Sequence, residues 1–330
     1  MIYKSYKDLG NDIHNNIHQL QGEGYDLVVG IPRSGMIPAY MIALLLNIHC
    51  TDLNAFLKNA RIAKGHTRKS STSLDTAWEA KKVLLVDDSL KTGNSMQEAV
   101  EAIQQQTPHE VTRLAIYVEK IRQHCVDLYF EALPGPRIYQ WNLFHQAIMH
   151  NSCLELDGVL CQAPGGEALE DEDRYRAYLA EALPLVLPTY RIGCIVTARP
   201  ERYREQTVQW LETHKIEYER LEMRDTTADV ETDVFERCAQ YKANCYQAST
   251  ARLFIEKQRP IAARISALTG RPVLCLDDGE LSQPGMVSVA RSGKRHLIRM
   301  GLIKAKRRFF LAIPDSTEIT MRNAYRRLFR

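Results

Sequence analysis

The sequence predicts an α/β protein in which parallel sheets flanked by helices are followed by a basic C-terminal segment. Short apolar runs at residues 27–29, 83–86 and 253–255 predict buried strands, because turn or polar residues bound each run. Helical patterns follow at residues 39–46 and 96–106. Strands that alternate with helices in this way are typical of parallel sheets.

Chain length and the positions of turn residues predict how the chain divides into domains. A chain of 330 residues fits two compact domains and an appendage. The turn residues Pro134–Pro136 mark the end of the first domain, and a strand pattern restarts near Asn151. We therefore predict domains at residues 1–148 and 149–280, and a basic helical tail at residues 281–330.

Composition predicts a cytoplasmic protein that does not enter a membrane. The net charge of +3 is too small to indicate a polyanion partner for the whole chain. The eight cysteines occur singly, without a C-x-x-C pair, which is typical of reduced thiols. The N-terminus does not resemble a signal peptide, and the longest apolar run, residues 37–48, is too short to span a bilayer.

The segment Val83–Ser95 carries the strongest signal for function. Its apolar run ends in two adjacent acids, Asp87 and Asp88, and a loop with hydroxyl and glycine residues then leads into a helix. The N-terminus of a helix offers free backbone N–H groups to an anion. An acid pair can hold vicinal hydroxyls or a hydrated Mg²⁺. The segment therefore predicts a site for a sugar phosphate. Alone, it would also fit a strand end with an ordinary turn and helix cap.

The same segment resembles the signature with which type I phosphoribosyltransferases bind 5-phosphoribosyl 1-pyrophosphate (PRPP). The resemblance implies that Asp87 and Asp88 are catalytic, hold the two ribose hydroxyls and bind Mg²⁺ as cofactor. It also implies that the loop binds the 5′-phosphate. The loop residues are Lys91, Thr92, Gly93, Asn94 and Ser95.

A second loop in the expected order supports this resemblance. Tyr25–Gly30 reads as a short buried strand, and Ile31–Pro38 follows it. This turn resembles the pyrophosphate loop of the same family, which often carries a non-proline cis peptide. The resemblance implies that Arg33, Ser34 and Gly35 bind pyrophosphate, although a plain strand-to-helix connection would look similar.

Residues 56–78 form a long polar segment between the two loops. The resemblance implies a mobile hood that closes over the reacting centre and brings cations to the pyrophosphate. A solvated surface loop is the alternative. Its cationic residues are Lys58, Arg61, Lys64, His66, Arg68 and Lys69.

Lys91 bears on the identity of the acceptor. Family members that use 6-oxopurines usually carry an aspartate at this loop position, near the base. A protonated lysine cannot accept a proton. Lys91 therefore favours an orotate-type acceptor over a 6-oxopurine. Residues 117–137 show no pattern typical of a base-specific pocket.

The segment Cys153–Cys161 places two more acids, Glu155 and Asp157, on one side of an extended chain. It resembles the first motif of haloacid dehalogenase-like phosphatases, which reads Asp-x-Asp-Gly. Asp157 matches the general acid/base, and Glu155 stands where the nucleophilic aspartate would be. The resemblance implies that both residues are catalytic and also bind a metal.

Three further positions follow in the order of that superfamily. Thr197, at the end of a strand pattern, matches its phosphate-binding threonine, and Lys242 matches its motif lysine. Glu256 is the positional match for a metal ligand. Asp277 and Asp278 are a second choice for that role, and an ordinary turn explains them better.

Two interpretations of the second domain stay open. The longer Glu155 side chain would shift the nucleophile, because attack on phosphorus depends on distance and direction. The domain is either a working phosphatase that releases a nucleoside from the product, or a degenerate hydrolase fold. The helical pattern at residues 171–183 leaves room for a minimal cap.

Residues 291–330, within the predicted tail, are strongly basic. Residues 291–330 hold twelve Lys or Arg and two acids, a formal charge of +10. Contact with nucleic acid is one interpretation. A basic helical appendage that packs its apolar side chains on a domain is the favoured one.

Together these observations predict Mg²⁺-dependent transfer of a phosphoribosyl group from PRPP to a small-molecule acceptor, with release of pyrophosphate. A regulator that binds PRPP or a nucleotide without turnover is the alternative. We expect a homo-oligomer.

Overall fold

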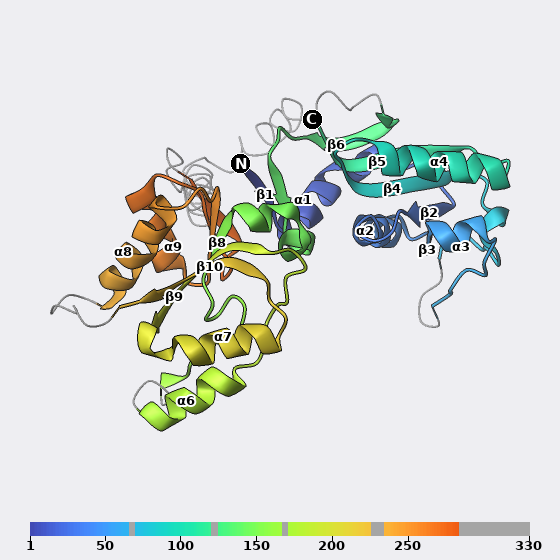
Figure 1. Cartoon of the computed structure of the whole chain (residues 1–330). Coiled ribbons are helices and arrows are strands. Elements are labelled where there is room, and N and C mark those ends of the chain that lie inside the picture. Colours follow the sequence, from blue (N-terminus) through green and yellow to red (C-terminus); the bar gives the residue numbers. More distant parts are fainter. Residues whose placement is uncertain (66–69, 120–124, 167–170, 226–233, 284–330) are drawn as a thin grey trace, which may run out of the picture. The chain divides into compact units, whose positions relative to one another are not determined.

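The computed structural model describes residues 1–65, 70–119, 125–166, 171–225 and 234–283 (Figure 1). Residues 1–281 form one compact unit, and its sheets are described separately below. The hood residues His66, Arg68 and Lys69, and nearly all of the predicted tail, lie outside the described residues.

The first sheet has five parallel strands in the order β3-β2-β4-β5-β6. The central strand is β4, and its residues 83–86 pair with β2 on one side and with β5 on the other. The strands are β2 (Leu27–Gly30), β3 (His49–Asp52), β4 (Val83–Leu90), β5 (Val111–Val118) and β6 (Leu128–Ala132).

Helices cover both faces of this sheet, which explains why β2 and residues 83–86 of β4 are apolar. Val28 and Leu84 pack in one core with helices α1 (Tyr6–Asn16) and α2 (Met36–Leu46). Val29 and Leu85 pack in another core with α3 (Leu53–Leu57) and α4 (Asn94–Gln106). Successive side chains of a strand therefore point to opposite faces of the sheet and pack in different cores. Short 3₁₀ turns lie at η1 (Ile17–Gln19) and η2 (Ala77–Glu79).

A small two-stranded sheet joins the N-terminus to the segment after β6. Strand β1 (Ile2–Lys4) pairs in parallel with β7 (Arg137–Tyr139). The 3₁₀ segments η4 (Gln140–His145) and η5 (Ala147–Asn151) follow. Strand β7 is thus held in place by a segment more than 130 residues earlier in the chain.

The second sheet has the order β10-β9-β8-β11-β12-β13. The chain starts in the middle at β8, adds β9 and β10 on one side, and then adds β11 and β12 in parallel on the other side. Ligands of open α/β sheets bind where the strand order reverses, which here is the end of β8. The strands are β8 (Ser152–Leu154), β9 (Ile192–Pro200), β10 (Tyr218–Arg224), β11 (Leu253–Glu256), β12 (Val273–Cys275) and β13 (Glu280–Ser282).

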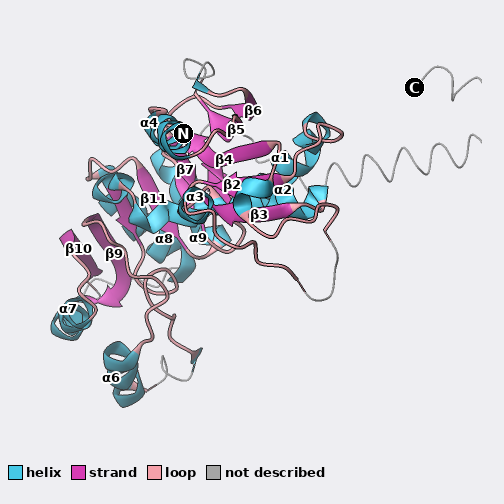
Figure 2. Ribbon diagram, turned by 90° about the vertical axis from the view of Figure 1, so that its right-hand side faces the viewer, coloured by secondary structure: helices cyan, strands magenta, loops and turns pink. Residues whose placement is uncertain are grey.

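Helices also cover both faces of the second sheet. Helices α8 (Val234–Gln247) and α9 (Arg259–Thr269) share a core with Cys153 and Val196. Helix α7 (Arg204–Thr213) packs on the other face, and Figure 2 shows it beside β9 and β10. Helix α6 (Glu172–Glu181) contacts α7, and η6 (Glu201–Tyr203) leads into α7.

Several element boundaries differ from the predictions. Strand β4 continues through both acids to Leu90, because Ser89 and Leu90 pair with Tyr117 and Val118 of β5. Helix α4 begins at Asn94, so two residues of the predicted loop form its first turn. Strand β9 likewise runs past Thr197 to Pro200. Acids and hydroxyl residues in a strand hide such extensions from a hydrophobicity pattern.

The predictions for the cysteines and for membrane-spanning segments can be compared with the structure. All eight cysteines are free thiols. Within the described residues, the helices are too short or too polar for any of them to cross a bilayer.

Candidate functional site

The acid pair and the predicted pyrophosphate loop meet at the end of β4. The Ser34 hydroxyl donates to Asp88 Oδ1 at 2.8 Å, and the Trp141 indole N–H donates to Asp88 Oδ2 at 2.6 Å. Asp87 Oδ1 accepts from the backbone N–H of Asp88 at 2.9 Å. The acids are only 8% and 3% exposed. The structure thus brings the acid pair of β4 together with a loop that lies more than 50 residues earlier in the sequence.

The charge of this acid pair is not balanced by the part of the chain that the structure describes. Burial, followed by the neighbouring charge of Asp88, raises the pKa of Asp87 well above its usual value. No lysine or arginine among the described residues forms an ion pair with either acid. Mg²⁺ binds through one or two carboxylates and the phosphates of its substrate. Two buried acids with only neutral donors therefore fit Mg²⁺ that arrives with a phosphorylated ligand.

The predicted phosphate loop leads into the N-terminus of α4. Gly93 caps the helix with a φ of +88°, and a Cβ at this position would lie 3.2 Å from Cys125 Sγ. Lys91 and Thr92 are exposed, as are Asn94 and Ser95 in the first helical turn. Their hydroxyl, amide and ammonium groups, with the free N–H groups of the helix, can take a phosphate.

The predicted pyrophosphate loop follows β2 directly. The peptide bond between Pro32 and Arg33 is cis, as the family resemblance implies. A Cβ on Gly35 would lie 2.6 Å from the Ile31 carbonyl oxygen and 2.8 Å from that of Val86, so this close approach requires glycine. Arg33 is exposed and is available to an anionic ligand.

Sequence reasoning missed the segment that closes over the acid pair. Trp141 holds Asp88 and stacks on Tyr139, with ring centroids 4.9 Å apart, and Tyr139 stacks on Tyr117 at 5.4 Å. Arg137 donates to the Leu90 carbonyl at 2.8 Å, directly before the phosphate loop. In the sequence these residues stand out only as a group of aromatic residues after a Gly-Pro turn. That pattern does not indicate that they contact β4.

One ion pair lies within the described part of the predicted hood. Lys64 forms an ion pair with Asp75, and both side chains are exposed. Exposed pairs of this kind contribute little to stability. The closing movement of this segment therefore stays a prediction.

A second group of charged residues lies at the end of β8. Lys242 of α8 forms ion pairs with Glu155 and with Glu256, the latter at 2.6 Å. The Asp157 carboxylate accepts from Arg199 Nη2 at 2.7 Å and from the Tyr178 hydroxyl at 2.5 Å. All acids in this group therefore face a cation of the chain itself.

Burial governs the electrostatics of this second group. Burial raises the pKa of Glu155, and the charge of Lys242 opposes that shift. Burial alone would lower the pKa of Lys242, but Glu155 and Glu256 raise it above its usual value. Burial likewise opposes the rise in the Arg199 pKa that Asp157 causes. Three acids thus share two cations, so the group keeps one formal negative charge.

The predicted metal ligands Glu155, Asp157 and Glu256 are paired with Lys242 and Arg199 in this arrangement. The described residues hold no cluster of three or more His, Cys, Asp or Glu side chains that could bind a metal ion. The sequence predicted no role for Arg199, which lies two residues after Thr197.

The contacts of the remaining predicted residues, Thr197, Asp277 and Asp278, show where each of them lies. The Thr197 hydroxyl is fully buried and accepts from the backbone N–H of Arg199 at 3.3 Å. Asp277 pairs with Lys257, and Asp278 pairs with Arg259. Glu256, rather than Asp277 or Asp278, therefore belongs to the network around Lys242.

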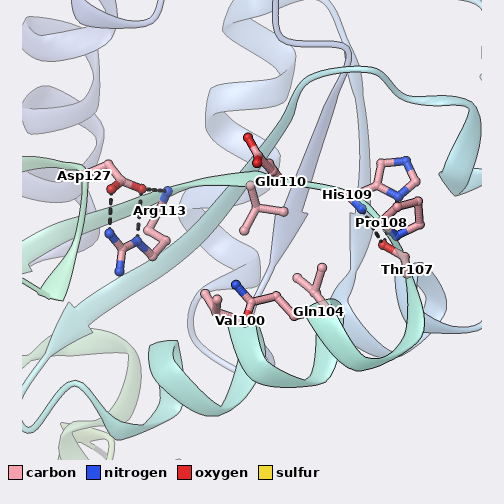
Figure 3. Close-up of a pocket in the computed structure, with 10 residues that line it drawn as sticks. Val100, Gln104, Thr107, Pro108, His109, Glu110, Arg113 and Asp127 are labelled. Atoms are coloured by element: carbon pink, nitrogen blue, oxygen red, sulfur yellow. Dashed lines mark hydrogen bonds and ion pairs between the residues drawn. The ribbon is translucent and has the colours of Figure 1, made fainter.

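A cavity of about 590 Å³ lies elsewhere, between the C-terminal part of α4 and the start of β5 (Figure 3). Val100 and Gln104 line it from the helix, and Arg113, paired with Asp127, lines it from the strand. None of the predicted site residues lines this cavity. It lies at the end of β5 opposite to the acid pair.

Comparisons with known proteins concern mainly the first part of the chain. The family model "Phosphoribosyl transferase domain" matches residues 2–148. No curated protein sequence matches the chain.

Several solved structures resemble less than half of the chain. A purine phosphoribosyltransferase from Pyrococcus horikoshii is 18% identical with a TM-score of 0.31, and the match covers 42% of this chain and 92% of that one. The xanthine-guanine-hypoxanthine phosphoribosyltransferase of Helicobacter pylori is 15% identical with a TM-score of 0.33, with 43% and 92% covered. A UMP synthase from Leishmania donovani is 17% identical with a TM-score of 0.27, with 42% and 29% covered.

The matched residues include the acid pair, the phosphate loop and the pyrophosphate loop. They also include Trp141 and Arg137, which the sequence analysis did not single out. Residues 2–148 therefore match the phosphoribosyl transferase domain, the family that the segment Val83–Ser95 resembles.

Proposed function

We propose that residues 1–148 transfer a phosphoribosyl group from PRPP to a nitrogen atom of a small-molecule acceptor. The observation that carries this proposal is the buried pair Asp87 and Asp88, which has no cation of its own among the described residues and lies between two loops suited to anions. The match of residues 2–148 to the phosphoribosyl transferase domain supports it.

The reaction breaks the bond between ribose C1 and the pyrophosphate oxygen and forms a bond between C1 and the acceptor nitrogen. Pyrophosphate leaves with the bonding electron pair, and the proton of the acceptor nitrogen passes to solvent. Mg²⁺ would be held by Asp87, Asp88 and the substrate, and it supplies positive charge to the departing pyrophosphate.

The residues of the chain would position the substrate. The acid pair holds the two ribose hydroxyls, and Ser34 and Trp141 orient Asp88 for this task. The loop at residues 91–95 and the N-terminus of α4 hold the 5′-phosphate. Arg33, with the backbone of Ser34 and Gly35, holds pyrophosphate. Fixing both ends of the ribose lowers the entropic cost of reaching the transition state.

The acceptor in this proposal is a nucleobase-like compound of the orotate type. Lys91 supports it, because the exposed ammonium at this loop position cannot take a proton from a purine. A regulator that binds PRPP without turnover remains the competing proposal for this site.

Release of pyrophosphate from PRPP tests the two alternatives. The full chain with Mg²⁺, PRPP and a panel of nucleobases should release pyrophosphate with at least one base. Asp88→Asn should lower this rate about 100-fold, or about 2.7 kcal/mol in activation free energy. Asp127→Asn is the matched control, because Asp127 pairs with Arg113 at the far end of β5. PRPP binding without pyrophosphate release for every base would favour the regulator.

For residues 149–280 we propose a haloacid dehalogenase-like unit that has lost phosphatase turnover. Glu155, which would have to attack phosphorus, is buried and pairs with Lys242, while its Oε1 accepts from the backbone N–H of Leu156 at 2.9 Å. Glu155→Asp should then give no hydrolysis of p-nitrophenyl phosphate with Mg²⁺. Hydrolysis by the wild type or the variant would favour a phosphatase coupled to the first domain.

The remaining proposals concern the whole chain. The protein is a cytoplasmic homo-oligomer in this proposal, and the predicted packing of the basic tail concerns residues that lie outside the described part of the chain. Light scattering of the purified chain, with and without residues 284–330, would measure its mass and the contribution of the tail.

A further inference from the structure

Helix α2 has a second apolar face that the fold does not use. The face turned toward the sheet is buried and holds Pro38, Ala39, Ile42 and Ala43. Around the rest of the helix the side chains are also apolar, and none of its residues is charged. The residues of this outer face are Ile37, Tyr40, Met41, Leu44 and Leu45. They follow the i, i+3, i+4, i+7, i+8 spacing that is typical of a helix face packed against another element.

The outer face of α2 is exposed in the single chain. Tyr40 is 53% exposed, Leu44 78% and Leu45 45%, while Ile37 and Met41 are half-buried. Every other described helix carries at most one large hydrophobic side chain that is exposed. A surface helix normally turns polar residues to water, and burial of large apolar side chains is favourable. The outer face of α2 therefore fits a surface that another molecule covers.

The chemistry of this face limits its partner. Because α2 has no charged side chain, it offers no ion pair to a nucleic acid, a charged peptide or a lipid headgroup. The centres of protein interfaces are depleted of charge and enriched in aromatic residues and Met. Side chains four residues apart, such as Tyr40 and Leu44, form ridges that fit the grooves of another helix. The expected partner is therefore a helix with an uncharged apolar face.

A second copy of the chain supplies such a helix. A two-fold axis would place α2 against the same helix of the partner subunit, so that each apolar row meets an identical face. Among the described residues, another group of exposed apolar side chains lies in a segment that belongs to no helix, namely Leu183, Leu185, Leu187 and Tyr190. Contact of α2 with that segment would be head-to-tail and would leave one unpaired surface at each end.

We propose that α2 forms the centre of a homodimer interface, in which its outer face packs on the same face of a second copy. This inference rests on the proposed homo-oligomer and assigns the surface that forms it. At about 1.5 Å per residue, the helix is about 16 Å long. The apolar face is thus the centre of the interface. Its polar rim lies on neighbouring surface such as α1, which contacts α2 and exposes Asn11 and His14.

Light scattering of the full chain over a dilution series tests the assignment. The wild type should have twice the mass of one chain, and Leu44→Glu should weaken the dimer about 100-fold or more. The introduced carboxylate is hydrated in the single chain, because Leu44 is 78% exposed, but it loses its water in the dimer. Leu183→Glu is the matched control and should keep the wild-type mass, since Leu183 is 61% exposed but lies outside α2.

A pair of opposite charges separates a local effect from a damaged fold. Leu44→Lys alone should also be a monomer, and circular dichroism of both Leu44 variants should match that of the wild type. An equimolar mixture of Leu44→Glu and Leu44→Lys should form dimers more strongly than either variant alone, because opposite charges then meet within one interface.

The inference is overturned if Leu44→Glu keeps the wild-type mass, if Leu183→Glu dissociates the assembly instead, or if the mixed variants do not associate. A wild type that is monomeric at every concentration contradicts the proposed homo-oligomer as well. Phosphoribosyl transfer fails in a different way: the wild type is a dimer that Leu44→Glu dissociates, yet it releases no pyrophosphate from PRPP with any base.

Discussion

The two acid clusters of this chain differ in what neutralises them. Asp87 and Asp88 are contacted by a hydroxyl, an indole and a backbone N–H, all of them neutral donors. Glu155, Glu256 and Asp157 face Lys242 and Arg199. An acid pair without a cation can take one from a ligand, whereas each acid of the second cluster already pairs with a lysine or arginine of the chain. The difference favours the first cluster over the second as the ligand site.

Removing the central cation of the second cluster should have the largest effect. Lys242→Met leaves Glu155 and Glu256 buried side by side without compensation, since the lysine side chain is only 4% exposed. The free energy of unfolding should fall by about 3–5 kcal/mol, measured by urea unfolding. An unchanged unfolding midpoint would show that the network is not compensated in the way the contacts indicate.

Removing one acid of the same cluster should cost much less. Glu256→Gln leaves the single pair Lys242–Glu155 and relieves the repulsion between the two acids. We expect a loss of about 1 kcal/mol, because a charge-assisted hydrogen bond is lost and a repulsion disappears with it. A loss as large as that of Lys242→Met would contradict this ordering.

Removing an acid of the first cluster should have the opposite sign. The folded state raises the pKa of Asp87 above its ordinary value of 3.8. Its favourable contribution is therefore complete below the ordinary pKa and is lost as pH rises through the folded pKa. Asp87→Asn should stabilise the ligand-free fold at pH 8 by on the order of 1 kcal/mol. This gain should shrink as the pH is lowered toward 4, while pyrophosphate release is lost at every pH.

Urea unfolding at pH 8 and pH 4.5 measures this sign. Asp127→Asn is the control, because Arg113 lowers the pKa of Asp127 instead of raising it. Destabilisation of Asp87→Asn at pH 8 would mean that a cation outside the described residues balances the acid pair.

The smallest effect is expected from the metal alone. Mg²⁺ without PRPP should shift the unfolding midpoint by less than 1 °C, because the first cluster supplies only two carboxylates and each acid of the second cluster pairs with a lysine or arginine. Adding PRPP together with Mg²⁺ should raise it by several degrees. A strong shift with Mg²⁺ alone, abolished in Glu155→Gln, would assign a metal to the second cluster.

Local pattern was enough to predict the buried parts of strands β2, β4 and β11. The apolar run before Asp87 is β4, and the strand before Glu155 is β8. The partners of those acids were not predictable, because Trp141 lies 53 residues from Asp88 and Lys242 lies 87 residues from Glu155. Periodicity reports which side chains are buried, whereas the counter-charge of a buried acid depends on how distant segments pack.

Calorimetric titration of the full chain with PRPP and Mg²⁺ decides whether Asp87 and Asp88 form the ligand site. We expect one binding site per chain, lost in Asp88→Asn and unchanged within twofold in Glu155→Gln. Binding that persists in Asp88→Asn, or that disappears in Glu155→Gln, would contradict it.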